Sequence, residues 1–196
     1  MKILFSIFSY LLGAIPAGYI IYRLSERKDI RGFGSQSTGA TNILRLKGWK
    51  YALFVGVFDI FKGFVPVFLA LKVFPDKKIV LTCAFLVVIG HCYPIYIKFK
   101  GGKGVATTVG VYAALAIKPL LITLSVFLLV VVITRYVSLG SLLSALSFIF
   151  FVYLLENDIM IVYLSVAIFF LIAFQHRSNI IRLLKGNERK LGGKSR

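Results

Sequence analysis

The sequence predicts an all-α membrane protein, a polytopic bundle of about seven transmembrane helices. Hydrophobic residues make up 59% of the 196 residues, whereas a soluble globular chain has ~45–50%. They form long apolar runs that a soluble core of this size has no room to bury. The formal net charge of +17 lies mainly between the runs, as in cytoplasmic loops. The apolar content excludes a disordered chain, and the runs argue against a soluble nucleic-acid-binding protein.

The helices follow from the apolar runs, because about 20 such residues cross a ~30 Å hydrocarbon core. In chain order we expect helices over residues 3–22, 51–71, 79–97, 105–117, 120–134, 139–155 and 159–174. The first resembles a signal peptide, but its run is too long and lacks a convincing cleavage site, so we expect an uncleaved helix. The fourth and fifth are short, and they form either two full spans or a re-entrant pair. We interpret residues 1–196 as a single integral-membrane domain.

Lysine and arginine are distributed unequally between the two sides that these helices define. Of the 24, five lie on one side, one lies within a helix, and 18 lie on the other side. Those 18 fall in or beside four motif loops, at residues 24–50, 98–104, 135–138 and 175–196. Because cytoplasmic loops carry the excess of basic residues, we expect the N-terminus outside and the C-terminus in the cytoplasm.

The unusual polar sequences all lie in these predicted cytoplasmic loops. Residues 32–45 combine glycines, hydroxyls, an asparagine and an arginine, and residues 98–108 combine glycines, lysines and threonines. Glycine lets the backbone approach an anion, N–H groups form a concavity for it, and basic side chains supply charge. Such loops are also typical of plain turns and topology signals. Four of them on one face favour a phosphate pocket. The Walker A spacing is absent, so nucleotide hydrolysis is not implied.

Two charged residues and two histidines stand out in or beside the predicted helices. Asp59 and Lys62 are three residues apart near the middle of the second helix, so they share a face and can pair. Each costs ~2.5–3.5 kcal/mol at the bilayer centre. They either fix helix packing, or Lys62 directs its charge toward an anionic ligand. We interpret His91 as a hydrogen-bonded structural residue, and His176, near Asn179, as part of the site.

The C-terminal segment has an amphipathic pattern. Apolar residues alternate with polar ones over residues 179–185, which predicts a short helix on the membrane surface. The cytoplasmic loops contain few acids: Glu26, Asp29 and Glu188. We therefore predict no metal site.

Four ordered motifs carry a resemblance to a known family. They are GSQSTGATNILR at residues 34–45, DIFKG at 59–63, GHCYP at 90–94 with FKGGKGVAT at 99–107, and HRSNIIR at 176–182. Over nearly the whole chain, the set resembles the bacterial acyl-phosphate:glycerol-3-phosphate acyltransferases, the PlsY family.

The resemblance implies transfer of a fatty acyl group from acyl-phosphate to the 1-hydroxyl of sn-glycerol 3-phosphate. The products are lysophosphatidic acid and phosphate, at the first step of phospholipid synthesis, with no acyl-CoA. It further implies membrane lipids as surroundings, no cofactor, no nucleic acid and no obligatory protein partner. The expected location is the bacterial cytoplasmic (inner) membrane, with the active site facing the cytoplasm.

The resemblance and the residue types together suggest a role for each site residue. The predicted catalytic residues are His176, Asn179 and Lys103. The predicted substrate- and phosphate-binding residues are Ser35, Ser37, Thr41, Asn42, Arg45, Gly101, Gly102, Gly104, Thr107, Ser141 and Arg182. The residues predicted to be structural or accessory are Asp59, Lys62 and His91. The general base is either His176 or a substrate phosphate oxygen.

The main alternative is a membrane transporter of a small phosphorylated anion. Transport needs polar groups through the full membrane depth, whereas the predicted outer loops offer few hydroxyls beside their charges. A second alternative is another lipid enzyme, which would share the pocket and use a different donor. A purely structural subunit is a third, and it would not need four cationic, glycine-containing segments on one face.

Overall fold

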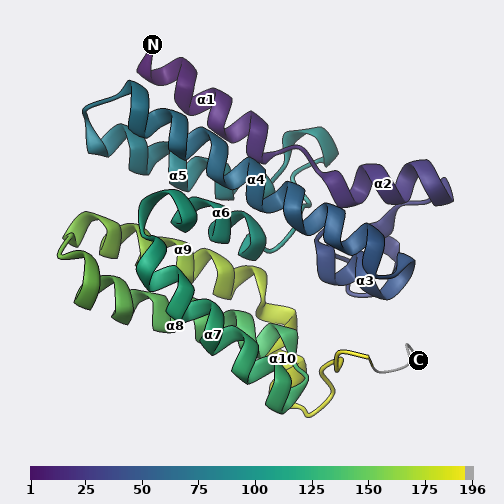
Figure 1. The fold of residues 1–196 in the computed structure, drawn as a ribbon. Helices are drawn as coiled ribbons and strands as arrows, with labels where there is room; N and C mark the ends of the chain where they lie inside the picture. Colours follow the sequence, from purple (N-terminus) through teal and green to yellow (C-terminus); the bar gives the residue numbers. More distant parts are fainter. Residues whose placement is uncertain (193–196) are drawn as a thin grey trace. The chain divides into compact units, whose positions relative to one another are not determined.

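The computed structural model describes residues 1–192, and its elements are α-helices with two short 3-10 turns (Figure 1). In chain order they are α1 (Lys2–Gly13), α2 (Ala17–Glu26), η1 (Ile30–Gly32), α3 (Ala40–Lys47), α4 (Trp49–Val73), α5 (Lys77–Cys92), η2 (Ile95–Ile97), α6 (Val105–Leu115), α7 (Ile117–Thr134), α8 (Val137–Glu156), α9 (Ile159–Gln175) and α10 (Arg177–Leu184). Residues 193–196 of the predicted motif loop 175–196 lie outside the described residues.

Five segments of the described chain are long and apolar enough to cross a membrane. They are Lys2–Glu26, Trp49–Val73, Lys77–Ile97, Ile117–Thr134 and Val137–Glu156. A sixth results if α9 and α10, which meet at a 64° bend, count as one span. Helix α6 is apolar but has only 11 residues. The all-α polytopic fold class is confirmed, while the number of seven spans and the orientation of the termini stay predictions.

Several predicted boundaries are wrong, and proline explains two of them. The helix predicted over residues 3–22 is broken at residues 14–16 into α1 and α2. Pro16 lacks an N–H and its ring conflicts with the carbonyl four residues earlier, so a new helix begins after it. The helix predicted over residues 79–97 likewise stops at Cys92, two residues before Pro94.

The predicted motif loops are partly helical. The loop predicted over residues 24–50 contains the end of α2, the turn η1 and all of α3. The loop at residues 98–104 is observed as predicted, between η2 and α6. The amphipathic helix predicted over residues 179–185 is observed as α10. The first and last of these loops therefore present part of their polar residues on short helices.

The chain divides into two compact units, and the first is Met1–Ala114. In this unit α5 packs along α1 and α4, and α3 packs on α4 (Figure 1). A Cβ on Gly63 of α4 would lie 2.1 Å from the carbonyl oxygen of Thr107, so only glycine allows α6 this close. A small apolar cluster joins α2, η1, α3 and α4, and its buried members are Tyr22, Ile30, Ile43 and Val55.

The second unit begins at Leu115. Helix α8 packs against both α7 and α9, and α10 folds back onto α8 and α9. The segment after α10 is tied to the same end of the unit, because Leu191 N–H donates to the carbonyl oxygen of Arg135 at 2.7 Å. The prediction of a single domain over residues 1–196 stays a prediction.

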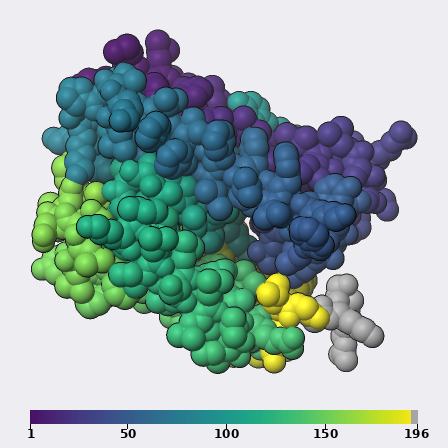
Figure 2. Space-filling view, viewed as in Figure 1, coloured from purple at the N-terminus to yellow at the C-terminus, as the bar shows by residue number. Residues whose placement is uncertain are grey.

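The surface of both units is strongly apolar. Large exposed side chains follow α4, including Phe54 and Phe61, and α7, including Leu128 and Val132. The side chains of α4 form the blue band across the visible face of the first unit (Figure 2). The charged side chains of Asp59 and Lys62, in contrast, are almost fully buried. This distribution is the reverse of a soluble protein's and suits helices surrounded by lipid.

Candidate functional site

The structure places the predicted site residues in two sets, one in each unit. The set in the first unit comprises Ser35, Ser37, Thr41, Asn42, Arg45, Gly101, Gly102, Lys103, Gly104 and Thr107. The set in the second unit comprises Ser141, His176, Asn179 and Arg182.

The serine loop, residues 33–39, is held in shape by Asn42. The Asn42 Oδ1 atom accepts from the Ser35 N–H at 2.8 Å. Its Nδ2 atom donates to the carbonyl oxygens of Ser37 at 2.9 Å and Phe33 at 3.2 Å. Both amide hydrogens are therefore used inside the loop, and the side chain is 1% exposed. Asn42 positions the serines in this structure instead of offering its own amide to a phosphate.

Helix α3 presents two of the predicted phosphate-binding side chains. Thr41 and Arg45 are four residues apart, so they lie on the same face of this helix. Both are half-buried, as is Ser35 in the loop before the helix. Gly39 is the N-cap, so the positive end of the α3 dipole faces the same loop. Hydroxyls, a guanidinium and a helix N-terminus are thus combined within eleven residues, which suits an anion.

The glycine loop, residues 98–104, lies on the C-terminal end of α5. The N–H groups of Gly101 and Gly102 donate to the carbonyl oxygens of Cys92 and His91, at 3.1 and 3.0 Å. These two N–H groups are therefore committed to α5. The donors directed at a ligand are expected from Lys103 onward, where the N-terminus of α6 follows at once.

Two threonines follow in the first turns of α6. The hydroxyls of Thr107 and Thr108 are buried, and neither makes a hydrogen bond within residues 1–192. A buried hydroxyl without a partner costs about 1–3 kcal/mol. Thr107 was predicted to bind phosphate, and its unused hydrogen-bonding capacity fits that prediction.

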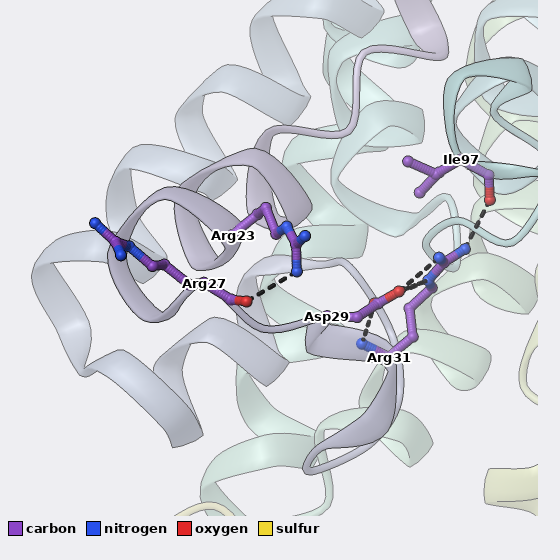
Figure 3. A network of polar contacts seen from close by, with 5 residues as sticks. All are labelled: Arg23, Arg27, Asp29, Arg31 and Ile97. Carbon is purple, nitrogen blue, oxygen red and sulfur yellow. Dashed lines mark hydrogen bonds and ion pairs between the residues drawn. The ribbon is translucent and has the colours of Figure 1, made fainter.

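Asp29 and Arg31 form an ion pair, here called the clamp, between the serine loop and the glycine loop (Figure 3). It connects the segment just before the serine loop to the segment just before the glycine loop. Arg31 Nη2 lies 2.6 Å from Asp29 Oδ2, and Arg31 Nε donates to Asp29 Oδ1 at 3.0 Å. Arg31 Nη1 donates to the carbonyl oxygen of Ile97 at 2.7 Å, just before the glycine loop. The guanidinium also stacks 5.4 Å from the ring centre of Tyr19. From the sequence, Asp29 and Arg31 are expected only as loop charges.

The clamp makes stability depend on pH. Hydrogen bonds from Arg31 lower the pKa of the Asp29 carboxyl, with a smaller opposing effect of burial. Because the folded pKa is depressed, Asp29 stabilises the fold above the unfolded value of ~3.9 and loses that contribution as the pH falls through the folded pKa. We expect wild type to have a higher melting temperature than Asp29→Asn at pH 6, and the difference to vanish in acid. A difference that stays constant from pH 6 to about pH 3 would contradict this assignment.

His176 stands where α9 ends and α10 begins, and its side chain is 2% exposed. Its Nδ1 atom lies 2.9 Å from the carbonyl oxygen of Ile172. A carbonyl oxygen only accepts, so Nδ1 carries the hydrogen, and the lone pair of the neutral ring is on Nε2. This tautomer, assigned from the hydrogen-bond partner, is the one that a general base would use.

Glu188 organises the second set, a role that was not predicted from the sequence. Its Oε1 atom accepts from Asn179 Nδ2 at 2.7 Å and from Ser138 Oγ at 3.1 Å. Its Oε2 atom accepts from Arg182 Nε at 2.8 Å, and the carboxylate is buried. The available signal was that Glu188 is the last acid in a strongly basic C-terminal segment. Ser141 is less informative, because its hydroxyl donates to the carbonyl oxygen of Val137 in its own helix.

The three residues predicted to be structural or accessory lie together inside the first unit. Lys62 Nζ and Asp59 Oδ1 are 2.9 Å apart, which confirms the predicted pairing. His91 Nδ1 lies 3.5 Å from the same oxygen atom. Within residues 1–192, no group of three or more His, Cys, Asp or Glu side chains could hold a metal ion. The absence of a metal from the reaction stays a prediction.

These features define a polytopic helical membrane protein whose polar motifs suit anionic groups. The family model described as glycerol-3-phosphate acyltransferase matches residues 3–186. The chain therefore belongs to the glycerol-3-phosphate acyltransferase family.

Relatives match the chain over almost its full length. The glycerol-3-phosphate acyltransferase of Endomicrobium trichonymphae is 41% identical, over 97% of this chain and 96% of the relative. That of Thermoanaerobacter pseudethanolicus is 40% identical, over 98% and 97%. A solved structure also matches, that of PlsY (YgiH), an integral membrane glycerol 3-phosphate acyltransferase. Its glycerol 3-phosphate form matches with a TM-score of 0.94 and 38% identity, over 97% of this chain and 96% of that one. Its lysophosphatidic acid form matches with a TM-score of 0.90 and 37% identity, over 97% and 95%.

Proposed function

We propose that this chain transfers a fatty acyl group from acyl-phosphate to the 1-hydroxyl of sn-glycerol 3-phosphate, without acyl-CoA. The observation that carries the proposal is the similarity over 97% of the chain to PlsY, solved in a glycerol 3-phosphate form and a lysophosphatidic acid form. The first ligand is the proposed acceptor and the second is the proposed product. The acyl-phosphate donor is the finer part of the proposal, and it rests on the motif resemblance.

In the proposed reaction the 1-hydroxyl oxygen attacks the carbonyl carbon of the mixed anhydride. A new ester C–O bond forms, the C–O bond to phosphate breaks, and phosphate leaves with the electron pair. The hydroxyl proton passes to a base. The donor is already activated, so the protein mainly has to align two anionic substrates and stabilise the departing charge. Alignment can lower such a barrier by ~7–11 kcal/mol, and preorganised donors add to this.

We assign phosphate binding in the first unit to three kinds of group. Ser35 and Thr41 offer hydroxyls, Arg45 offers a planar fork, and Lys103 offers a mobile charge next to the N-terminus of α6. Ser37, Asn42, Gly101 and Gly102 contribute by shaping the two loops that present these groups.

In the second unit, we assign His176 to the hydroxyl proton and Asn179 to orientation of the acceptor. Arg182 uses its Nε–H on Glu188, and its guanidinium carries four further N–H groups that suit a phosphate. If a phosphate oxygen of the substrate is the base instead, we expect His176 variants to keep most of their kcat.

We further propose that the protein works in the bacterial inner membrane with these motifs at the cytoplasmic face. The distribution of basic residues supports this, because 18 of the 24 fall on the side that carries the motif loops.

The proposal is tested with purified protein, acyl-phosphate and radiolabelled glycerol 3-phosphate, with lysophosphatidate as the product measured. Charge-assisted hydrogen bonds contribute about 1.5–3 kcal/mol. We therefore expect Lys103→Ala to lower kcat/KM by roughly 10- to 150-fold. Lys103→Arg, which keeps the charge, is the matched control and should lose less. If wild type forms no product, the acyltransferase proposal is wrong, and uptake of phosphate esters into liposomes would then test transport.

A further inference from the structure

A cluster of three ionisable side chains lies inside the first unit, and the proposed reaction gives it no role. Asp59 and Lys62 of α4 are each 2% exposed, and His91 of α5 is 6% exposed. Asp59 Oδ1 is 2.9 Å from Lys62 Nζ and 3.5 Å from His91 Nδ1. Charged groups are costly within a membrane, and those that remain there generally pair and serve a function.

The Lys62 end of the cluster reaches the break between α1 and α2. Its Nζ atom donates to the carbonyl oxygen of Ile15 at 2.8 Å. Ile15 lies in the interruption caused by Pro16, where a carbonyl has no regular helical partner. The ammonium therefore joins α4 to the point from which α2 leads toward the serine loop.

The His91 end of the cluster reaches the glycine loop. A Cβ placed on Gly102 would lie 2.0 Å from His91 Nε2, so the imidazole ring is in direct contact with the Gly102 backbone. The Gly102 N–H also donates to the His91 carbonyl oxygen at 3.0 Å. The same residue thus supports the loop with both its ring and its backbone. The opposite ring nitrogen, Nδ1, lies 3.5 Å from Asp59 Oδ1 and makes no hydrogen bond within residues 1–192, so Asp59 acts on the ring through proximity of charge.

We propose that Asp59, Lys62 and His91 are positioning residues that fix the glycine loop in its phosphate-binding conformation. The inference rests on the proposed function only in assigning a phosphate to that loop. Glycine-rich segments lose much conformational freedom when they become ordered. A loop that is ordered before the substrate arrives binds more tightly, because binding then involves no further loss of conformational entropy in the loop. Loosening the cluster should therefore raise KM for a phosphate substrate more than it lowers kcat.

The first test is hydrogen–deuterium exchange of the full-length protein, which needs no activity. We expect the peptide covering residues 99–104 to exchange about tenfold faster in His91→Ala, since its amides lose their support. Asp59→Asn alone leaves Lys62 buried without its partner and risks misfolding. The double variant Asp59→Asn/Lys62→Met removes both charges and should show the same local increase. Asp76→Asn, at the other end of α5, is the control and should leave this peptide unchanged.

The second test couples His91 to Gly102 in the acyl-transfer assay. Gly102→Ala should lower kcat/KM strongly, because the added methyl group collides with the His91 ring. Combining Gly102→Ala with His91→Ala removes the collision and should recover about fivefold or more of the lost kcat/KM, a non-additivity expected of residues in contact. Additive losses would show instead that the His91 ring does not contact Gly102 in the protein. We also expect His91→Ala alone to raise KM with kcat changed by less than about threefold.

The exchange and kinetic results test the positioning role independently of the proposed function. Unchanged exchange at residues 99–104 in both His91→Ala and the neutral double variant would overturn the positioning role. Additive losses in the Gly102 and His91 pair would also overturn it. A wild-type protein that makes no lysophosphatidate would overturn the proposed function, and the exchange data would still decide whether the cluster orders the loop.

Discussion

Replacing His176 with asparagine is expected to lower kcat for acyl transfer by about 100-fold or more, because general-base catalysis contributes ~10²–10⁴-fold. The asparagine side chain can place an N–H where His176 Nδ1 now donates to the Ile172 carbonyl oxygen. The variant can therefore keep this hydrogen bond while it removes the basic Nε2 atom with the rest of the ring. Steady-state kinetics at saturating acyl-phosphate and glycerol 3-phosphate measure the effect.

His176→Ala serves as the comparison, because it removes both the base and the hydrogen bond. If His176→Asn keeps more than about a tenth of the wild-type kcat, a histidine base is excluded. The base is then the substrate phosphate oxygen, and His176 only shapes the junction between α9 and α10.

Replacing Glu188 with alanine is expected to destabilise the second unit strongly. The carboxylate accepts hydrogen bonds from Ser138, Asn179 and Arg182, and the change leaves all three without this acceptor. Breaking a buried ion pair costs about 3–5 kcal/mol. Because Arg182 is partly exposed, we expect the lower end, about 3 kcal/mol, or a melting temperature lowered by roughly 6–12 °C. Circular dichroism at 222 nm in detergent gives this temperature.

Two further variants serve as controls for Glu188→Ala. Glu188→Gln keeps an acceptor oxygen but loses the charge beside Arg182, so its melting temperature should fall between those of wild type and Glu188→Ala. Glu156→Ala changes a half-buried acid at the C-terminal end of α8 in the same unit and should have little effect. A Glu188→Ala protein that melts within about 1 °C of wild type would show that the network contributes nothing to stability.

The parts of the fold that depend on residues close together in the sequence were predictable. Apolar runs located the membrane helices, and the spacing of Asp59 and Lys62 on one helix predicted their ion pair correctly. The break near Pro16 was missed because the hydropathy stays high through it, although proline itself was the available signal.

The site was less predictable, because its contacts join distant parts of the chain. Asn42 was predicted to bind phosphate, whereas its side chain holds the serine loop through bonds that depend on a conformation that residue spacing does not reveal. Glu188 contacts Ser138, fifty positions earlier, so no local pattern indicates its role. The contact of His91 with Gly102 likewise depends on how the chain turns back onto α5 after Pro94.

The central claim is acyl transfer from acyl-phosphate to glycerol 3-phosphate, and donor choice tests it most directly. Purified protein is given radiolabelled glycerol 3-phosphate with either palmitoyl-phosphate or palmitoyl-CoA, and lysophosphatidate and inorganic phosphate are both quantified. We expect equal amounts of lysophosphatidate and phosphate from palmitoyl-phosphate, roughly 10- to 150-fold slower formation of both with Lys103→Ala, and no product from palmitoyl-CoA. Product from palmitoyl-CoA at a comparable rate, or no product from either donor, would contradict this claim.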